Sequence, residues 1–231
     1  HPPRTKEVSG HDLARGKVMK TDELITVLST NVEPVDRRQL SREIVAAVAA
    51  GTMATIGIAL TLPGMRADLS GPNALTYFCA KIVFAAVVII AGTMYLLRLA
   101  RPGSMSHTRA APATWPPLVV AALAAISLVS APLWHWHKMA MGDGWLECLV
   151  SIPLIAVVPF VAVVWAVRRM APTDLIQTGA LAGFVAGGMS AAGYALHCTD
   201  DSLPFIALWY GGAILMCTLA GALLGPRLLR W

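Results

Sequence analysis

Charged residues are scarce in this chain: aspartate, glutamate, lysine and arginine make up only 13% of its 231 positions. A soluble globular domain carries roughly a quarter of such residues. Hydrophobic residues make up 56% of the chain. This composition predicts an integral membrane protein whose helices are surrounded by lipid, and it argues against a soluble domain.

The sequence also lacks the motifs of common enzymes and cofactor sites. It has no P-loop and no dinucleotide-binding glycine fingerprint, and its serine, histidine and aspartate residues do not follow the order of a hydrolase triad. The metal-ligand spacings CxxC and HxxxH are absent. We therefore predict that the protein is not an enzyme and requires no cofactor.

Six apolar runs are long enough to cross a bilayer as helices, which takes about 20 residues each. Prolines and glycines such as Pro63-Gly64 and Pro116-Pro117 are expected at the span ends, where freed backbone groups can meet water. We predict an all-α polytopic membrane protein with a six-helix transmembrane domain over residues 44–231. The predicted spans are Ile44–Leu62, Leu75–Leu97, Leu118–Trp136, Trp145–Val167, Leu175–Leu196 and Phe205–Leu224.

Lysine and arginine fall mainly on one side of this predicted bundle, which by the positive-inside rule is the cytoplasm. The other side has Arg66 and Lys138 in its loops, and Lys81 about a turn inside the second span, where its side chain can extend to the interface. Six crossings return the chain to its starting side, so both termini are predicted to be cytoplasmic. The basic residues of that side are Lys20, Arg37, Arg38, Arg42, Arg98, Arg101, Arg109, Arg168, Arg169, Arg227 and Arg230.

The placement of charge also limits the function. The net charge of +5 comes from short clusters between apolar runs and not from one basic patch, so direct nucleic-acid binding is not expected. Apart from Lys81 and Glu147, both near the outer ends of their spans, no ionisable residue lies deep within a span. Pumps and ion-coupled transporters place carboxylates or histidines at such depths. The spans therefore argue against transport.

The residues before the first span divide into two parts. Residues 1–18 have mixed charge and no apolar periodicity, and we expect them to be a cloning remnant or an upstream extension, with the native start at Met19. Residues 19–43 are predicted to form a cytoplasmic arm. Its second helix would begin at Val35 or Asp36 and run into the first span.

The first helix of this arm carries an apolar stripe. Thr21 or Asp22 can cap it, and Leu24, Ile25 and Leu28 then fall on one face. A helix this short is marginal in water, so the stripe needs a partner. It would pack on the cytoplasmic loops, lie in the lipid headgroups or dock a soluble protein.

Three of the four cysteines are predicted to lie at the outer face. Cys198 would end the fifth helix, Cys148 would lie one turn inside the fourth, and Cys79 would lie at a similar depth on the second. The fourth and fifth helices are antiparallel neighbours, so Cys148 and Cys198 should be close together. Thiols at such sites can form a disulfide or bind soft and borderline metals. Additional candidate ligands are His197, Glu147, Asp200 and Asp201.

Other notable residues are expected to be structural. Cys79 and Cys217 should pack between helices as small apolar side chains. His135 and His137 fit an interfacial aromatic belt, and haem ligation by either is a weaker alternative. The glycines that allow close helix approach are Gly179, Gly183 and Gly187 in the fifth span and Gly221 and Gly225 in the sixth.

Five segments together resemble the negative regulator of sigma F (NrsF) family, which are six-helix membrane anti-sigma factors paired with extracytoplasmic-function sigma factors. The similarity runs from Met19 to Trp231. Its most specific parts are the "HCTDDS" and "ALWYG" stretches and the arginine-rich end. The segments are "MKTDELITVLSTNVEPVDRRQL", "GWLECLVSIPL", "APTDLIQTGALAGFVAG", "YALHCTDDSLPFIALWYGGAI" and "GALLGPRLLRW".

The resemblance implies a function. The family's outer-face cysteines correspond to Cys148 and Cys198, and "MKTDELI" corresponds to the sigma-contacting arm, so that Asp22 and Glu23 join its leucines and isoleucine as candidate contacts. The protein would hold a sigma factor at the bacterial inner membrane. It would release the sigma factor when heavy metal, bound transiently at the outer thiols, or oxidative stress is sensed. The alternative is a membrane thiol oxidoreductase or small metal transporter that uses the same cysteines.

Overall fold

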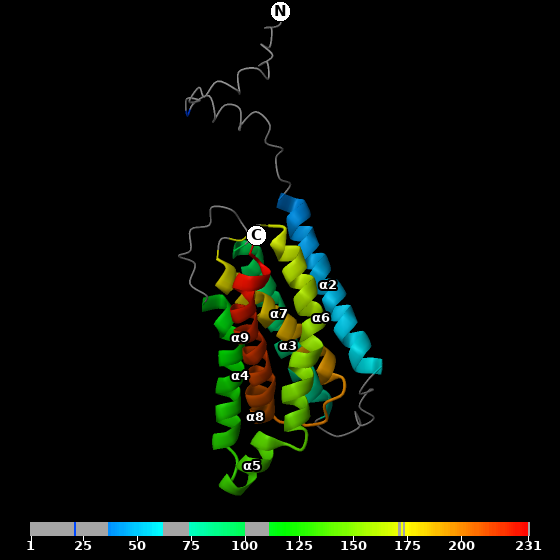
Figure 1. The fold of residues 1–231 in the computed structure, drawn as a ribbon. Coiled ribbons are helices and arrows are strands. Elements are labelled where there is room, and N and C mark those ends of the chain that lie inside the picture. The colour runs from blue at the N-terminus through cyan, green and yellow to red at the C-terminus, as the bar shows by residue number, and fades with distance from the viewer. Residues whose placement is uncertain are drawn as a thin grey trace, which may run out of the picture. The chain divides into compact units, whose positions relative to one another are not determined.

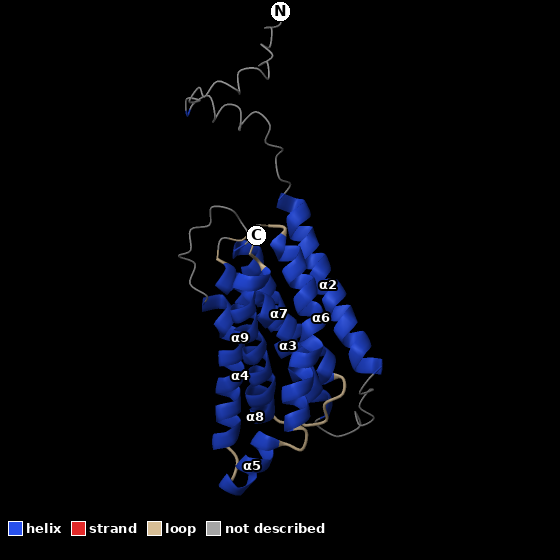
Figure 2. Cartoon of the chain, viewed as in Figure 1, coloured by secondary structure: helices blue, strands red, loops and turns tan. Residues whose placement is uncertain are grey.

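The computed structural model describes residues 21, 37–61, 74–99, 111–170, 172 and 174–230. The chain forms two compact units, His1–Arg37 and Arg38–Trp231. Every regular element in the described residues is a helix (Figure 2), which confirms the all-α prediction. The elements are α2 (Arg37–Thr61), α3 (Ala74–Leu99), α4 (Ala111–Val129), α5 (Leu133–Met141), α6 (Trp145–Arg168), α7 (Leu175–Ala195), α8 (Leu203–Phe205), the π-helical turn η2 (Ile206–Tyr210) and α9 (Gly211–Leu228).

Five helical stretches of the described residues are long and apolar enough to cross a membrane, where the sequence predicted six spans. The difference lies in the third predicted span, Leu118–Trp136, which is wrong as a single helix. α4 ends at Val129, and α5 begins after Pro132. Proline lacks an amide hydrogen and disfavours helical geometry in the residue before it, so the chain turns here.

The structure also differs from the sequence-based expectations in the place of Pro116 and Pro117, and it describes the helix that leads into the first span. Pro116 and Pro117 were expected at a span end but lie inside α4. The apolar part of α4 with described side chains, Trp115–Val129, is shorter than the five spanning stretches. The predicted helix from Val35 or Asp36 into the first span corresponds to α2, which runs unbroken from Arg37.

α7 is the central helix of the second unit, and it packs against α3, α6 and α9 (Figure 1). Sixteen of its 21 residues are buried. Its glycines permit the closest approach, because a Cβ atom on Gly183 would overlap the backbone carbonyl of Cys217 in α9. Gly179 meets Gly221 and Gly225 in the same way. The predicted role of these glycines in close helix packing is therefore confirmed.

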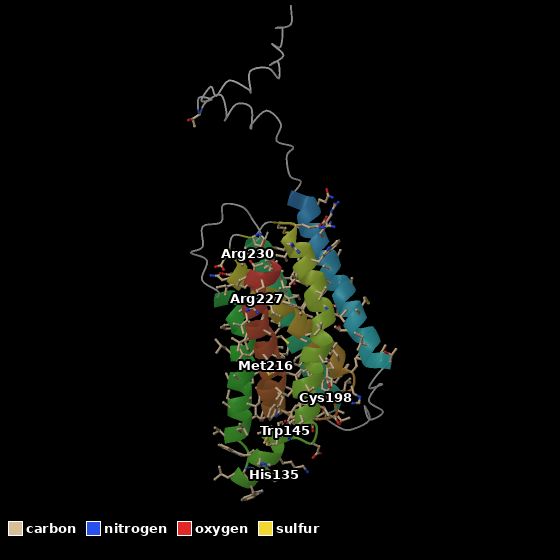
Figure 3. The ribbon with its side chains drawn as sticks, viewed as in Figure 1. His135, Trp145, Cys198, Met216, Arg227 and Arg230 are labelled. Carbon is tan, nitrogen blue, oxygen red and sulfur yellow. The ribbon has the colours of Figure 1, made fainter. Side chains whose placement is uncertain are left out.

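The helices place basic residues at one end of the bundle. Arg169, at the end of α6, forms an ion pair with Glu43 near the start of α2, with 3.5 Å between Nη1 and Oε2. The same guanidinium lies 3.9 Å from the ring centroid of Trp165. Arg227 and Arg230 of the C-terminal segment lie at this end as well (Figure 3). We call it the basic end.

The opposite end of the bundle holds the cysteine cluster. His135, Trp145 and Cys198 lie there, far along the helices from Arg227 and Arg230 (Figure 3). We call it the thiol end. The separation of basic residues from the thiols agrees with the distribution predicted from the sequence.

The contact between α7 and α9 gives a first testable prediction. Gly183→Ala should lower the free energy of unfolding by about 3 kcal/mol, because the added Cβ would meet a backbone carbonyl that no side-chain rotation can move. Gly212→Ala is the matched control in α9, since a Cβ there meets nothing within 4 Å. The control should leave stability within about 0.5 kcal/mol. Unfolding by dodecyl sulfate in mixed micelles measures both, and equal effects of the two substitutions would refute this packing.

Candidate functional site

The segment from His197 to Ser202 follows α7 and leads into α8 at the thiol end. We call it the junction segment. Its start continues the helix, since the amide of Cys198 donates to the carbonyl of Tyr194 at 3.1 Å. The polar groups that follow bond to α3, to the turn before α6 and to α5. The segment therefore links α7 to several of its neighbours.

The first link is to Lys81 of α3, whose side chain is fully buried. Its Nζ donates to the carbonyl oxygen of Cys198 at 3.0 Å and to Oδ1 of Asp201 at 3.2 Å. A buried ammonium in an apolar bundle is costly unless it is paired and hydrogen-bonded. Lys81 therefore holds the junction segment, and the expectation that it extends to the membrane interface is wrong.

The second link runs from Asp200 to the turn before α6. Its carboxylate accepts hydrogen bonds from the backbone amides of Asp143 at 3.1 Å and Gly144 at 2.9 Å. Gly144 is the N-cap of α6 and supplies no side-chain cap. Asp200 thus caps α6 from another segment, with its negative charge at the positive end of the helix dipole.

The turn that receives Asp200 depends on Gly142. This residue has a φ of 56°, in the left-handed region that favours glycine. A Cβ at this position would also lie 2.7 Å from the Phe205 ring and 2.8 Å from the Asp200 carboxyl carbon. The turn and the junction segment are therefore fitted to each other.

The third link joins the junction segment and η2 to α5. Ser202 Oγ donates to the carbonyl of Met139 at 2.7 Å, and Trp209 Nε1 donates to the carbonyl of Ala140 at 2.7 Å. The Trp209 ring also lies 4.9 Å from the Trp145 ring, between centroids. These contacts hold η2 against α5 and against the start of α6.

The two predicted sensing thiols lie beneath these links. Cys148, in the first turn of α6, is fully buried, and Cys198 is 5% exposed. Both belong to the same core cluster of buried residues. No disulfide joins them. Cys148 and Cys198 therefore share one buried region of the bundle, and their action as one site stays a prediction.

A polar cavity of about 270 Å³ opens beside Cys198. Glu147, His197 and Asp200 contribute to its lining, together with Tyr194. The His197 ring lies 5.9 Å from the Tyr194 ring, in an edge-to-face arrangement. The cavity gives small solutes a polar approach to Cys198.

The remaining candidate residues occupy distinct places. Asp201 is paired with Lys81, and Asp200 is bonded to backbone amides, so neither carboxylate points at the thiols as a ready ligand. In the part of the chain that the structure describes, no three histidine, cysteine or acidic residues are grouped as a metal site. Metal binding by Cys148, Cys198, His197, Glu147, Asp200 and Asp201 stays a prediction.

The other two cysteines differ from each other. Cys217 is buried at the α7–α9 contact, as expected for a packing residue, since a Cβ on Gly187 would lie 3.2 Å from its Cβ. Cys79 is exposed on α3, so the expectation that it packs between helices is wrong. His135 and His137 are exposed on α5. The predicted sigma contacts Asp22, Glu23, Leu24, Ile25 and Leu28 lie outside the described residues.

The sequence analysis missed two residues of the site. Lys81 was treated as interfacial, although a single lysine among apolar residues is itself a signal for a buried partner. Tyr210, fully buried in η2, was not considered. The "ALWYG" stretch that contains it was noted, but nothing in the sequence shows which way its tyrosine faces.

Residues 28–231 match the family model described as negative regulator of sigma F, NrsF. The chain belongs to the NrsF family. The probable anti-sigma-F factor NrsF of Azospira oryzae is 32% identical over 213 residues, which cover 92% of this chain and 100% of the relative. The anti-sigma-F factor NrsF of Caulobacter vibrioides is 30% identical over 220 residues, with the same coverage of both chains. No solved structure matches the chain.

Family membership confirms the resemblance seen in the sequence. The two relatives carry the names of regulators and not of enzymes. Within the site, Lys81, Asp200 and Ser202 each bond to a group on a neighbouring helix, turn or segment.

The Lys81 link gives a second testable prediction. Asp201→Asn should lower the free energy of unfolding by about 3 kcal/mol, because it leaves the buried Lys81 ammonium without its counter-charge. Asp143→Asn is the matched control, since the exposed Asp143 takes part in the site through its backbone amide. The control should change stability by less than about 0.5 kcal/mol. Thermal denaturation in detergent measures both, and a stable Asp201→Asn protein would contradict the importance of the pair.

Proposed function

We propose that this chain is a membrane anti-sigma factor that sequesters an extracytoplasmic-function sigma factor through its arm, residues 19–43. A signal at the thiol end releases the sigma factor. The observation that carries the proposal is membership of the NrsF family over residues 28–231, together with two relatives named as anti-sigma-F factors. The alternative functions have no comparable support.

The proposed location is the bacterial inner membrane, with the basic end in the cytoplasm. Lysine and arginine favour the cytoplasmic ends of membrane helices. The start of α2 and the end of α9 lie at the same end of the bundle (Figure 1), which supports a topology with both of these helix ends in one compartment. This topology requires α4 to cross with the five longer helices, and its 19 residues rise about 28 Å.

The proposed signal is heavy metal or an oxidant that reaches Cys148 and Cys198. A thiophilic divalent ion would displace two protons and bind both sulfurs as thiolates. An oxidant of the dithiol would take up two electrons and two protons and leave a disulfide. The polar cavity beside Cys198 supplies the approach for either reagent.

Coupling from the thiols to the arm would run through the junction segment. The Cys198 carbonyl is bonded to Lys81 of α3, and the neighbouring Asp200 caps α6. A change at Cys198 therefore acts on three helices together. Shifting a two-state equilibrium from 1:99 to 99:1 takes about 5.5 kcal/mol of differential affinity, and two new metal–thiolate bonds are a sufficient source.

The thiols give a third prediction. Cys148→Ser and Cys198→Ser should each abolish most of the transcriptional response to cadmium or a thiol oxidant. The double variant should respond no less than either single variant, because loss of one sulfur already removes a site that needs both. Cys79→Ser and Cys217→Ser are the matched controls and should respond normally. A sigma-dependent reporter gene measures this. A normal response in both Cys148→Ser and Cys198→Ser would place the signal elsewhere.

The arm gives a fourth prediction. Leu24→Asp with Leu28→Asp should weaken sigma-factor binding by about tenfold or more, because two apolar contacts are replaced by charges that lose hydration on binding. The regulon should then be expressed without inducer, at normal protein levels in the membrane. Thr26→Asp with Thr30→Asp places the same charge on the opposite helix face and should still repress. Repression by the leucine variant would move docking to the cytoplasmic loops.

A further inference from the structure

An apolar groove of about 820 Å³ lies between α3, α4, α7 and the segment formed by η2 and α9 (Figure 1). Its volume is within the usual range for sites that hold a small organic molecule. The described residues that line it are apolar apart from Tyr95, Gln177 and Thr218. The Thr218 hydroxyl donates to the carbonyl of Ile214 in its own helix at 2.8 Å, so it needs no polar ligand. The wall of the groove therefore suits a hydrocarbon chain.

Two successive glycines leave one wall of the groove open. Gly211 and Gly212 begin α9, and both line the groove. A Cβ added to either would meet nothing within 4 Å, so no close helix approach requires glycine there. Neither residue has a positive φ, and glycine costs helix stability relative to alanine. The space they leave is a feature that packing within the chain does not explain.

The groove extends over about the depth of one bilayer leaflet. On α3 it runs from Phe84 to Tyr95, a rise of about 16 Å, and one leaflet contributes about 15 Å to the hydrocarbon core. On α7 it reaches Gln177, in the first turn of that helix. Lys81 near the start of α3 and Cys198 after α7 meet at the thiol end. The opposite limit of the groove, at Tyr95 and Gln177, is therefore the one nearer the basic end.

Positive charge lies just beyond this limit of the groove. Arg98, in the last turn of α3, is exposed and lies one helical turn past the groove on the same side of the helix. The described acidic residues at this end are already engaged. Glu43 is paired with Arg169, and the Asp174 carboxylate accepts a hydrogen bond from the amide of Gln177. Basic sites between membrane helices attract anionic headgroups, so this end of the groove favours a phosphate.

We propose that the groove holds one acyl chain of an anionic phospholipid from the leaflet at the basic end, with the phosphate beside Arg98 and Gln177. The chain follows the apolar wall toward Phe84 and fills the space that Gly211 and Gly212 leave open. It supplies the dispersion contacts that the walls of an empty groove would lack. Because α4 lines one side of the groove and α7 and α9 line another, the lipid completes the packing of these helices. The site is separate from the thiols and does not depend on them.

The first test measures lipid binding to the purified full-length chain by native mass spectrometry, with phosphatidylglycerol and phosphatidylcholine of identical acyl chains as probes. The parent should bind one phosphatidylglycerol more strongly than phosphatidylcholine. Gly212→Leu should weaken phosphatidylglycerol binding by about tenfold, because the leucine side chain displaces about two methylene groups from the groove. Gly57→Leu is the matched control, since Gly57 is an exposed helical glycine of α2 whose added Cβ also meets nothing. Equal effects of the two leucine variants would overturn the site.

The second test concerns the headgroup. Arg98→Gln should reduce the preference for phosphatidylglycerol over phosphatidylcholine by about fivefold, because one positive charge near the phosphate is lost. Lys138→Gln is the matched control, since it removes an exposed cation from α5 at the thiol end and should leave the preference unchanged. Equal binding of the two lipids by the parent would overturn the anionic headgroup.

The third test locates the acyl chain in the unsubstituted protein, so it does not depend on the folding of a variant. The probe is phosphatidylglycerol with a diazirine at the end of one acyl chain, in nanodiscs of phosphatidylglycerol and phosphatidylethanolamine. Photolabelling should concentrate at Phe84 and Ala207, in the part of the groove farthest from the basic end, and unlabelled phosphatidylglycerol should compete.

Two results of the photolabelling would overturn the proposal. One is labelling of exposed α6 residues such as Leu154 and Val161 with no excess in the groove. The other is labelling of the groove that ubiquinone suppresses and phosphatidylglycerol does not, which would assign the groove to a neutral isoprenoid. Both results would leave the proposed sigma-factor function intact, because that function depends on the arm and the thiols.

Discussion

The buried ammonium of Lys81 is the constraint on which the thiol end depends. A lone cation inside an apolar bundle must be paired and hydrogen-bonded, and the partners available to it are the Cys198 carbonyl and the Asp201 carboxylate. That requirement fixes the path of the junction segment. With the path fixed, Asp200 meets the amides that open α6, and Ser202 meets α5. The cysteines are then held between helices whose positions depend on the same few bonds.

The close contact between α7 and α9 explains how a change at one end of the bundle could be felt at the other. Backbone meets backbone along Gly179, Gly183 and Gly187, so the two helices have little room to move independently. α7 carries the junction segment at its C-terminus, and α9 ends at the basic end with Arg227. The close packing of α7 and α9 thus connects the thiol end to the basic end through one tightly packed helix pair.

Much of the fold could be predicted from local patterns in the sequence. Apolar run length predicted most of the helices, and four-residue glycine spacing predicted that a neighbouring helix approaches α7 closely. The order of the spans predicted that Cys148 and Cys198 lie at the same end, and both belong to one core cluster. The features that the sequence did not predict depend on contacts between distant residues or on a single residue. Nothing local shows that Lys81 pairs with Asp201, 120 positions away, or that Asp200 caps a distant helix. The break at Pro132 lay inside an apolar run, and the π-helical turn η2 has no sequence signature of its own.

The central claim is that Cys148 and Cys198 act as one chemical unit, and a reagent that requires two neighbouring thiols tests it most directly. Phenylarsine oxide bridges a close dithiol through one arsenic. In the full-length protein with Cys79→Ser and Cys217→Ser, mass spectrometry should find one arsenic per chain, with both remaining thiols protected from alkylation. Either Cys148→Ser or Cys198→Ser should remove stable binding. Alkylation of both thiols at unchanged rates in the presence of the arsenical would contradict the claim.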